Sequence, residues 1–281
     1  MKFVLFGTPT IAATTLTELR ASGLLPELIV TAPPRPAGRG MKMLEPPVKV
    51  WAEQNDIASV QPEKLSEKDF LSVLKEVNAD VFVLVAFGKI LPEDILNMTP
   101  NGILNLHPSL LPKHRGPSPI QSTILSGDKV SGVTIIKLDE QVDHGPILAK
   151  EELELNGEET TTELENHFGK IGGELLAKIL RKIEAGEELD SVEQEHSTAT
   201  FTKKIVKADG EIHKSDSDET KWRKFRAFHT WPSIFYFENG KRIKITDAKF
   251  VDGKFVICKI IPEGEKEIST KNSLCEPDID E

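Results

Sequence analysis

The chain has 281 residues, 38% of them hydrophobic and 28% charged, as expected for a globular protein with one large and one small domain. Its longest apolar runs, such as 81–86, are too short to cross a bilayer, which argues against membrane insertion. The formal net charge of -10 argues against a generally basic, nucleic-acid-binding surface. The two cysteines, Cys258 and Cys275, show no metal-site spacing and no disulfide framework, so we expect a reducing cytoplasm.

The N-terminal half alternates short apolar runs with amphipathic stretches, beginning with a first strand rather than a signal peptide. This alternation is typical of βαβ units and predicts a mainly parallel sheet. The expected strands cover 2–6, 28–31, 79–85, 102–106, 132–138 and 147–155, and the expected helices 11–21, 49–55 and 68–77. A long helix follows, because apolar residues recur at three- and four-residue steps from Leu164 to Ile183, with Thr161 or Thr162 as cap and Gly186 at the end.

A second domain is indicated beyond the polar, acidic stretch 187–200. Asn239-Gly240 lies between apolar runs and predicts a β-hairpin. Strands are expected over 233–238, 241–245 and 255–261, after a helix near 219–228. We therefore expect a catalytic domain at 1–186, a linker at 187–205, a small β domain at 206–274 and an acidic tail at 275–281.

Asn105 and His107 are the most informative pair of polar residues. On an extended strand, residues two apart leave the same face, so an amide and an imidazole would lie side by side. Such a pair can contact one developing oxyanion, and a nearby carboxylate such as Asp143 could keep the imidazole charged. These groups suit acyl-type transfer from a carrier to an amine. The alternative is a hydrogen-bonded histidine at a strand end, without a catalytic role.

The string that follows, 107–116, supports a functional role. It is too polar for a core and too rich in proline for a helix, and long irregular segments in compact domains are commonly functional. A basic, glycine-containing loop over 35–42 comes after the second strand, where sheets of this type present loops to ligands. Its Arg35, Arg39 and Lys42 suit contact with phosphate, although a solvated basic loop would look the same.

Together these motifs resemble the folate-dependent formyltransferases, most closely those that act on methionyl-tRNA. The resemblance runs from Met1 to about Asn272 and rests on the order of the motifs along the chain. The motifs are Phe6-Gly-Thr-Pro9, Arg35-Pro-Ala-Gly-Arg-Gly40, Pro46-Pro-Val-Lys49, Ala86-Phe-Gly-Lys-Ile-Leu-Pro92, His107-Pro-Ser-Leu-Leu-Pro112, Gly132-Val-Thr-Ile-Ile136, Asp143-His-Gly145, Lys203-Lys-Ile-Val-Lys-Ala-Asp-Gly-Glu211 and Arg226-Ala-Phe-His-Thr-Trp-Pro232.

The resemblance implies an α/β fold, with a Rossmann-like, mainly parallel sheet followed by a small OB-like β-barrel. The barrel is expected to be incomplete, because the connection from 250–255 to 262–266 is nearly direct. The family's catalytic residues fall on Asn105, His107 and Asp143. The implied donor is 10-formyltetrahydrofolate, and no metal is expected. The implied folate-binding residues are Phe87, Gly88, Ile90, Leu91, Pro92, Ser109, Leu110, Leu111 and Pro112.

The implied acceptor is the amino group of initiator methionyl-tRNA, for translation initiation, with a monomeric enzyme in the cytoplasm. The tRNA-binding residues would be Arg35, Arg39, Lys42, Lys203, Lys204 and Lys207. The alternative enzyme is a sugar-nucleotide N-formyltransferase acting on an amino sugar. A glycinamide ribonucleotide formyltransferase is disfavoured because such chains end near the long helix. A silent folate- or RNA-binding module is disfavoured by the three intact catalytic residues.

Overall fold

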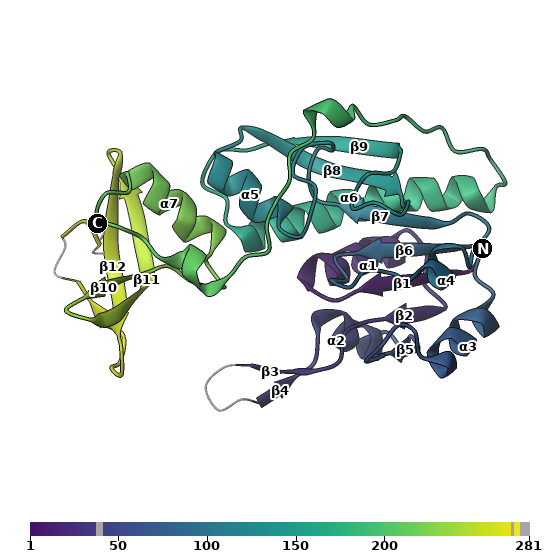
Figure 1. The fold of residues 1–281 in the computed structure, drawn as a ribbon, viewed down its shortest axis with the longest axis horizontal. Coiled ribbons are helices and arrows are strands. Elements are labelled where there is room, and N and C mark those ends of the chain that lie inside the picture. Colours follow the sequence, from purple (N-terminus) through teal and green to yellow (C-terminus); the bar gives the residue numbers. More distant parts are fainter. Residues whose placement is uncertain (38–41, 271–272, 276–281) are drawn as a thin grey trace. The chain divides into compact units, whose positions relative to one another are not determined.

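The computed structural model describes residues 1–37, 42–270 and 273–275 (Figure 1). The chain divides into two compact units. Unit 1 contains 1–119, 130–153 and 165–202, and unit 2 contains 120–129, 154–164 and the chain from 203 onward. Within the described ranges, no helix is long and apolar enough to span a membrane.

Unit 1 is built on a seven-stranded sheet with the strand order β5-β2-β1-β6-β7-β8-β9. The strands are β1 (Phe3–Gly7), β2 (Leu28–Val30), β5 (Ser59–Val60), β6 (Val81–Val85), β7 (Ile103–His107), β8 (Val130–Lys137) and β9 (Ile147–Glu154). The pairs from β5 to β7 are parallel, whereas β8 runs antiparallel to β7. The predicted Rossmann-like, mainly parallel fold is confirmed.

The helices connect these strands as the alternating pattern predicted. They are α1 (Thr10–Ala21), α2 (Pro47–Gln54), α3 (Lys68–Val77), α4 (Glu93–Leu96), α5 (Pro119–Ser126) and α6 (Thr161–Glu184). A small hairpin, β3 (Arg35–Ala37) and β4 (Lys42–Leu44), follows β2. The hairpin, the short strand β5 and the helices α4 and α5 were not expected, because none of them has a long apolar repeat.

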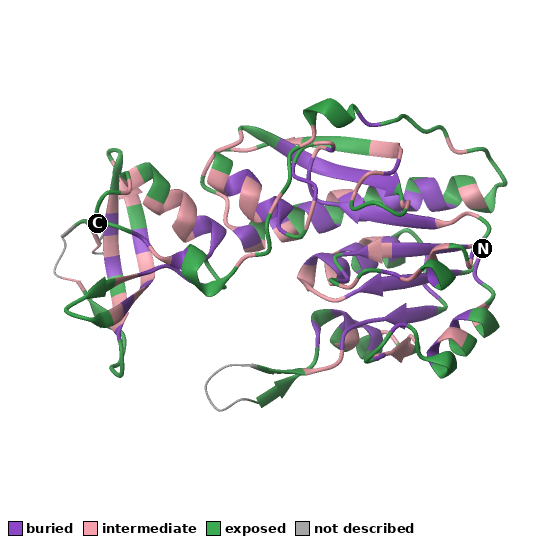
Figure 2. Cartoon of the chain, viewed as in Figure 1, coloured by how far each residue is buried: buried purple, intermediate pink, exposed green. Residues whose placement is uncertain are grey.

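The central strands are buried on both faces, so they appear almost entirely purple in Figure 2. Phe6 on β1 packs edge-to-face against Phe82 on β6 and against Phe87, with ring centroids 5.3 and 5.5 Å apart. Phe70 and Leu74 of α3 join the same core cluster. This packing holds the carboxyl ends of β1, β6 and β7 together at one edge of the sheet.

Unit 2 carries an antiparallel sheet of the order β10-β11-β12-β13 and the helix α7 (Asp218–Ala227). Its strands are β10 (Phe235–Glu238), β11 (Lys241–Val251), β12 (Lys254–Pro262) and β13 (Ile268–Ser269). The predicted hairpin at Asn239-Gly240 is confirmed, with φ of 50° and 77°. No ladder joins β10 to β13 within the described part of the chain, so this sheet is an open one of four strands.

The prediction for the cysteines was wrong. Cys258 on β12 and Cys275 form a disulfide that closes a loop of sequence separation 17. The spacing along the chain did not reveal the pair, because their proximity depends on how the segment after β13 returns to β12. Since disulfides are uncommon in reducing compartments, the cysteines no longer support a cytoplasmic location.

Candidate active site

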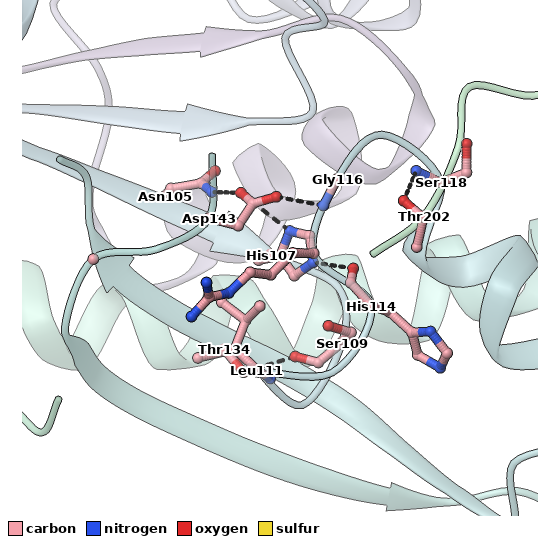
Figure 3. A network of polar contacts seen from close by, with 12 residues as sticks. Asn105, His107, Ser109, Leu111, His114, Gly116, Ser118, Thr134, Asp143 and Thr202 are labelled. Atoms are coloured by element: carbon pink, nitrogen blue, oxygen red, sulfur yellow. Dashed lines mark hydrogen bonds and ion pairs between the residues drawn. The ribbon is translucent and has the colours of Figure 1, made fainter. Parts of the chain in front are cut away.

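Asn105 and His107 project from the same face of β7, as their two-residue spacing predicted (Figure 3). Their strand lies between β6 and β8, in register with Leu84 and Thr134. Both side chains are only 4% exposed. An amide and an imidazole are therefore held in a largely desolvated environment, where their interactions with charge are stronger than in water.

Asp143 joins this pair from the loop between β8 and β9. Its Oδ1 lies 3.1 Å from Asn105 Nδ2 and 3.5 Å from His107 Nδ1. Its Oδ2 accepts a hydrogen bond from the backbone N–H of Gly116 at 2.7 Å. The three residues proposed from the sequence thus meet, and the amide and the imidazole converge on one oxygen atom (Figure 3).

The partners of His107 define its proton positions. Its Nε2 lies 3.0 Å from the carbonyl oxygen of His114, which can only accept, so Nε2 carries a proton. Its Nδ1 faces the carboxylate of Asp143, and this contact is attractive only when Nδ1 also carries a proton. A doubly protonated His107 would therefore form an ion pair with Asp143, whose oxygens also accept hydrogen bonds from Asn105 and Gly116.

The segment after β7 is irregular, as predicted, but the expectation that it is too polar for a core was wrong. Ser109, Leu111, His114 and Arg115 are all less than 9% exposed. Thr134 on β8 satisfies part of the buried backbone, because its hydroxyl donates to the Ser109 carbonyl at 2.7 Å and accepts from the Leu111 N–H at 3.1 Å. Side-chain bonds to the backbone thus let a polar segment enter the core.

The two segments predicted to bind folate leave neighbouring parallel strands, β6 and β7, at their carboxyl ends. Phe87 and Leu91 belong to the core, whereas Ile90 is 88% exposed. Ser109 is buried, and its hydroxyl donates to the Lys113 carbonyl, so its side chain is engaged within the protein. The arrangement places both segments at the edge where open α/β sheets bind ligands.

The basic residues predicted to contact tRNA are exposed wherever the structure describes them. Arg35 and Lys42 lie on the β3–β4 hairpin, which follows the carboxyl end of β2. Arg39 lies outside the described residues. In unit 2 the exposed cations are Lys203, Lys204 and Lys207.

Four further cations, which follow Lys207 in the sequence, form hydrogen bonds or ion pairs within unit 2. Arg223 bonds to Glu219 and to the Ser126 carbonyl, and Lys224 bonds to the Glu211 carbonyl. Arg226 is 5% exposed and donates to the Glu159 carbonyl, and burial lowers the pKa of its guanidinium. Lys221 forms an ion pair with Asp218. We therefore exclude these four from the candidate RNA-binding residues.

Sequence reasoning missed two buried residues next to the cluster of Asn105, His107 and Asp143. Gln194 donates to the backbone carbonyls of Asp143 and Gly145, and Arg115 donates to the side-chain oxygen of Gln194. Gln194 comes from the stretch expected to be a linker, where nothing in the pattern distinguished it from a solvated glutamine. The described residues contain no cluster of three or more His, Cys, Asp or Glu placed to hold a metal ion.

Gly145 offers a steric test of the loop that carries Asp143. A Cβ at this position would lie 1.9 Å from the Lys137 carbonyl oxygen, which is backbone and cannot move freely. We expect Gly145→Ala to displace the loop and to lower kcat at least tenfold. The free energy of unfolding should fall by about 1–3 kcal/mol. Gly173→Ala is the matched control, because its Cβ would also make a close contact, with Glu18, where α6 packs against α1. Equal kcat values for the two variants would contradict the expectation.

Comparison with known proteins agrees with this geometry. The formyl transferase family matches residues 1–180, and the formyl transferase C-terminal domain family matches 204–273. The chain belongs to the formyl transferase family. Methionyl-tRNA formyltransferases of Thermotoga neapolitana and Lachnospira eligens are each 39% identical to it over 252 residues, covering 90% of this chain and 80% of each relative.

Solved structures share the fold of this formyltransferase at lower sequence identity. Methionyl-tRNA formyltransferase from Clostridium thermocellum superposes with a TM-score of 0.63 at 16% identity, covering 96% of this chain and 100% of that one. An N-formyltransferase from Helicobacter canadensis, solved with folinic acid and dTDP-3-aminofucose, has a TM-score of 0.63 at 18% identity, covering 90% and 88%. These likenesses support the α/β architecture of the enzyme.

Proposed function

We propose that this enzyme transfers a formyl group from 10-formyltetrahydrofolate to the amino group of initiator methionyl-tRNA, for translation initiation. The observation that carries the proposal is the meeting of Asn105, His107 and Asp143 in a chain 39% identical to enzymes named for this reaction. A cytoplasmic, monomeric enzyme is proposed with it, since the acceptor belongs to cytoplasmic translation.

The proposed chemistry uses the cluster to stabilise charge. The neutral amine attacks the formyl carbon, and the electron pair of the carbonyl bond moves onto the formyl oxygen. Asn105 and the imidazolium of His107 donate hydrogen bonds to this oxyanion, as they now converge on Asp143 Oδ1. When the intermediate collapses, the bond from carbon to the folate nitrogen breaks. Asp143 accepts the proton that the amine loses, through a water, and returns it through a water to the folate nitrogen, so that the carboxylate is restored.

One hydrogen-bonding arrangement has to change for this step. Both ring nitrogens of His107 face protein groups, Nδ1 toward Asp143 and Nε2 toward the His114 carbonyl. We propose that the formyl oxygen takes the place of one of these partners or shares its N–H group. This agrees with the common behaviour of catalytic hydrogen bonds, which reach their final geometry only with substrate bound.

The donor is proposed to bind at the carboxyl edge of β6 and β7. The segments 87–92 and 109–112 border this end of the sheet, and Phe87, Leu91, Ser109 and Leu111 stabilise the two segments from within the core. Gly88 suits close approach, because its φ is 77° and the space beside its Cα is open.

The hairpin is proposed to bind the acceptor RNA through phosphate. We expect the double variant Arg35→Ala/Lys42→Ala to raise the KM for methionyl-tRNA and to leave the KM for folate unchanged. The slope of the logarithm of the tRNA-binding constant against the logarithm of the salt concentration should also become less steep. We expect a change of about 0.7–0.9 for each phosphate that is no longer neutralised. Kinetics at two salt concentrations measure both effects, with Lys75→Ala, an exposed lysine on α3, as the control. An unchanged KM and slope would contradict the proposed role of the hairpin.

The identity of the acceptor is tested by comparing turnover with two candidate substrates. Purified enzyme with 10-formyltetrahydrofolate is given either methionyl-tRNA or a dTDP-linked amino sugar, and formylated product is quantified. We expect turnover with methionyl-tRNA at least a hundredfold above that with the sugar. Turnover with the sugar nucleotide alone would replace the proposal by the sugar N-formyltransferase alternative, and no turnover with either would remove the enzymatic proposal.

A further inference from the structure

Gln194 is a buried glutamine whose amide is fully used. It is 5% exposed, and the neighbouring Val192 pairs with Ile147 at the start of β9. Its Nε2 lies 2.9 Å from the carbonyl oxygen of Asp143 and 2.7 Å from that of Gly145. Its Oε1 lies 3.2 and 2.7 Å from Nε and Nη2 of Arg115. Carbonyls only accept and guanidinium groups only donate, so the orientation of this amide is unambiguous.

These bonds hold a turn that the chain would not favour alone. Asp143 has a φ of 49°, in the left-handed region, which is strained for a residue other than glycine. Gln194 bonds the carbonyls on both sides of His144 and so offsets that strain. The backbone of Asp143 is thereby held on one side, and its carboxylate points to Asn105, His107 and Gly116 on the other.

Arg115 stabilises the opposite side of the Asp143 carboxylate. Its side chain is 3% exposed and also donates to His196 Nδ1 at 2.8 Å. Its backbone pairs with the segment around Phe201, through bonds from Arg115 N to the Thr200 carbonyl at 2.8 Å and from Thr202 N to the Arg115 carbonyl at 2.7 Å. The next residue is Gly116, whose N–H binds Asp143 Oδ2. Arg115 thus fixes Gln194 and the Gly116 donor together.

We infer that Gln194, held by Arg115, is a positioning residue for formyl transfer that sets the orientation of the Asp143 carboxylate toward His107. This inference rests on the proposed function. Gln194 does not touch the reacting atoms and acts through the loop 143–145. The segment 192–202 is therefore a part of the active-site framework, although its sequence is typical of a linker.

The experiment compares two substitutions at Gln194 with one remote amide. Gln194→Met removes every hydrogen bond at similar volume, and Gln194→Glu keeps an acceptor for Arg115 but loses both donors to the loop. Asn101→Leu is the control, because its amide also donates to a backbone carbonyl, that of Asp80, at the amino end of β7. Tm, kcat and the KM for 10-formyltetrahydrofolate are measured for each variant.

Both Gln194 variants should lower kcat about a hundredfold, the size of effect caused by misplacing a catalytic group by about 1 Å. The KM for 10-formyltetrahydrofolate should stay within twofold of the wild type. A loss confined to kcat is the readout that a general loss of structure would not give, since disruption of the whole site would raise the KM as well.

A kcat loss no larger than that of Asn101→Leu, or a KM for 10-formyltetrahydrofolate that rises as steeply as kcat falls, would overturn the inference. Wild-type enzyme that fails to formylate methionyl-tRNA would instead overturn the proposed function, so the two failures are distinguishable.

Discussion

His107→Gln is expected to lower kcat for formyl transfer about a thousandfold, the upper end of the cost of removing one oxyanion donor. The glutamine amide can still donate to the His114 carbonyl, which His107 Nε2 contacts at 3.0 Å, so that local bond can survive. The positive charge beside Asp143 is lost, and with it the group proposed to stabilise the formyl oxygen. Single-turnover kinetics with saturating substrates measure the chemical step directly.

The control for this prediction is His167→Asn, an exposed histidine on α6, which should keep wild-type turnover. Near-normal turnover of His107→Gln would remove His107 from the mechanism. It would also favour the alternative in which this histidine is only a hydrogen-bonded residue at a strand end. Far-UV circular dichroism on the same samples shows whether the fold is retained.

Asp143→Asn is expected to lower kcat by about 10²–10⁴, the range for losing a positioned acid–base group. The substitution preserves shape but removes charge. The carboxylate now accepts from Asn105 Nδ2 and from the Gly116 N–H, and faces His107 Nδ1. An amide has only one accepting oxygen, so its NH2 group must face at least one of these donors. Steady-state kinetics against pH report the loss.

Asp80→Asn is the matched control, because the Asp80 carboxylate also accepts a backbone N–H, that of Lys2, at 2.7 Å. It lies before β6, at the opposite end of the strand from the site. The double variant His107→Gln/Asp143→Asn should lose little more activity than the worse single variant, since the two groups act as a pair. Full additivity of the two losses would contradict that pairing.

Local sequence patterns were enough to predict six of the seven strands of the large sheet, the helices α1, α2, α3 and α6, and the hairpin at Asn239-Gly240, because these follow from periodicity and turn chemistry. They also placed Asn105 and His107 on one face of a strand, since alternation is a property of every extended chain. Asp143 was assigned from a family motif, and only the fold brings it to Asn105, across a separation of 38 residues.

The surroundings of this cluster follow from long-range packing instead. Gln194 and Arg115, 79 residues apart, meet because the segment after α6 returns along unit 1, a path that no local pattern specifies. The same holds for the disulfide of Cys258 with Cys275. Burial of the polar segment after β7 was also unpredictable, because its backbone needs the hydroxyls of Thr134 and Thr200 as hydrogen-bond partners, and these are in place only once β8 and the segment 192–202 have packed. Local propensity sets the elements of this enzyme, and tertiary packing sets the loops that position its proposed catalytic groups.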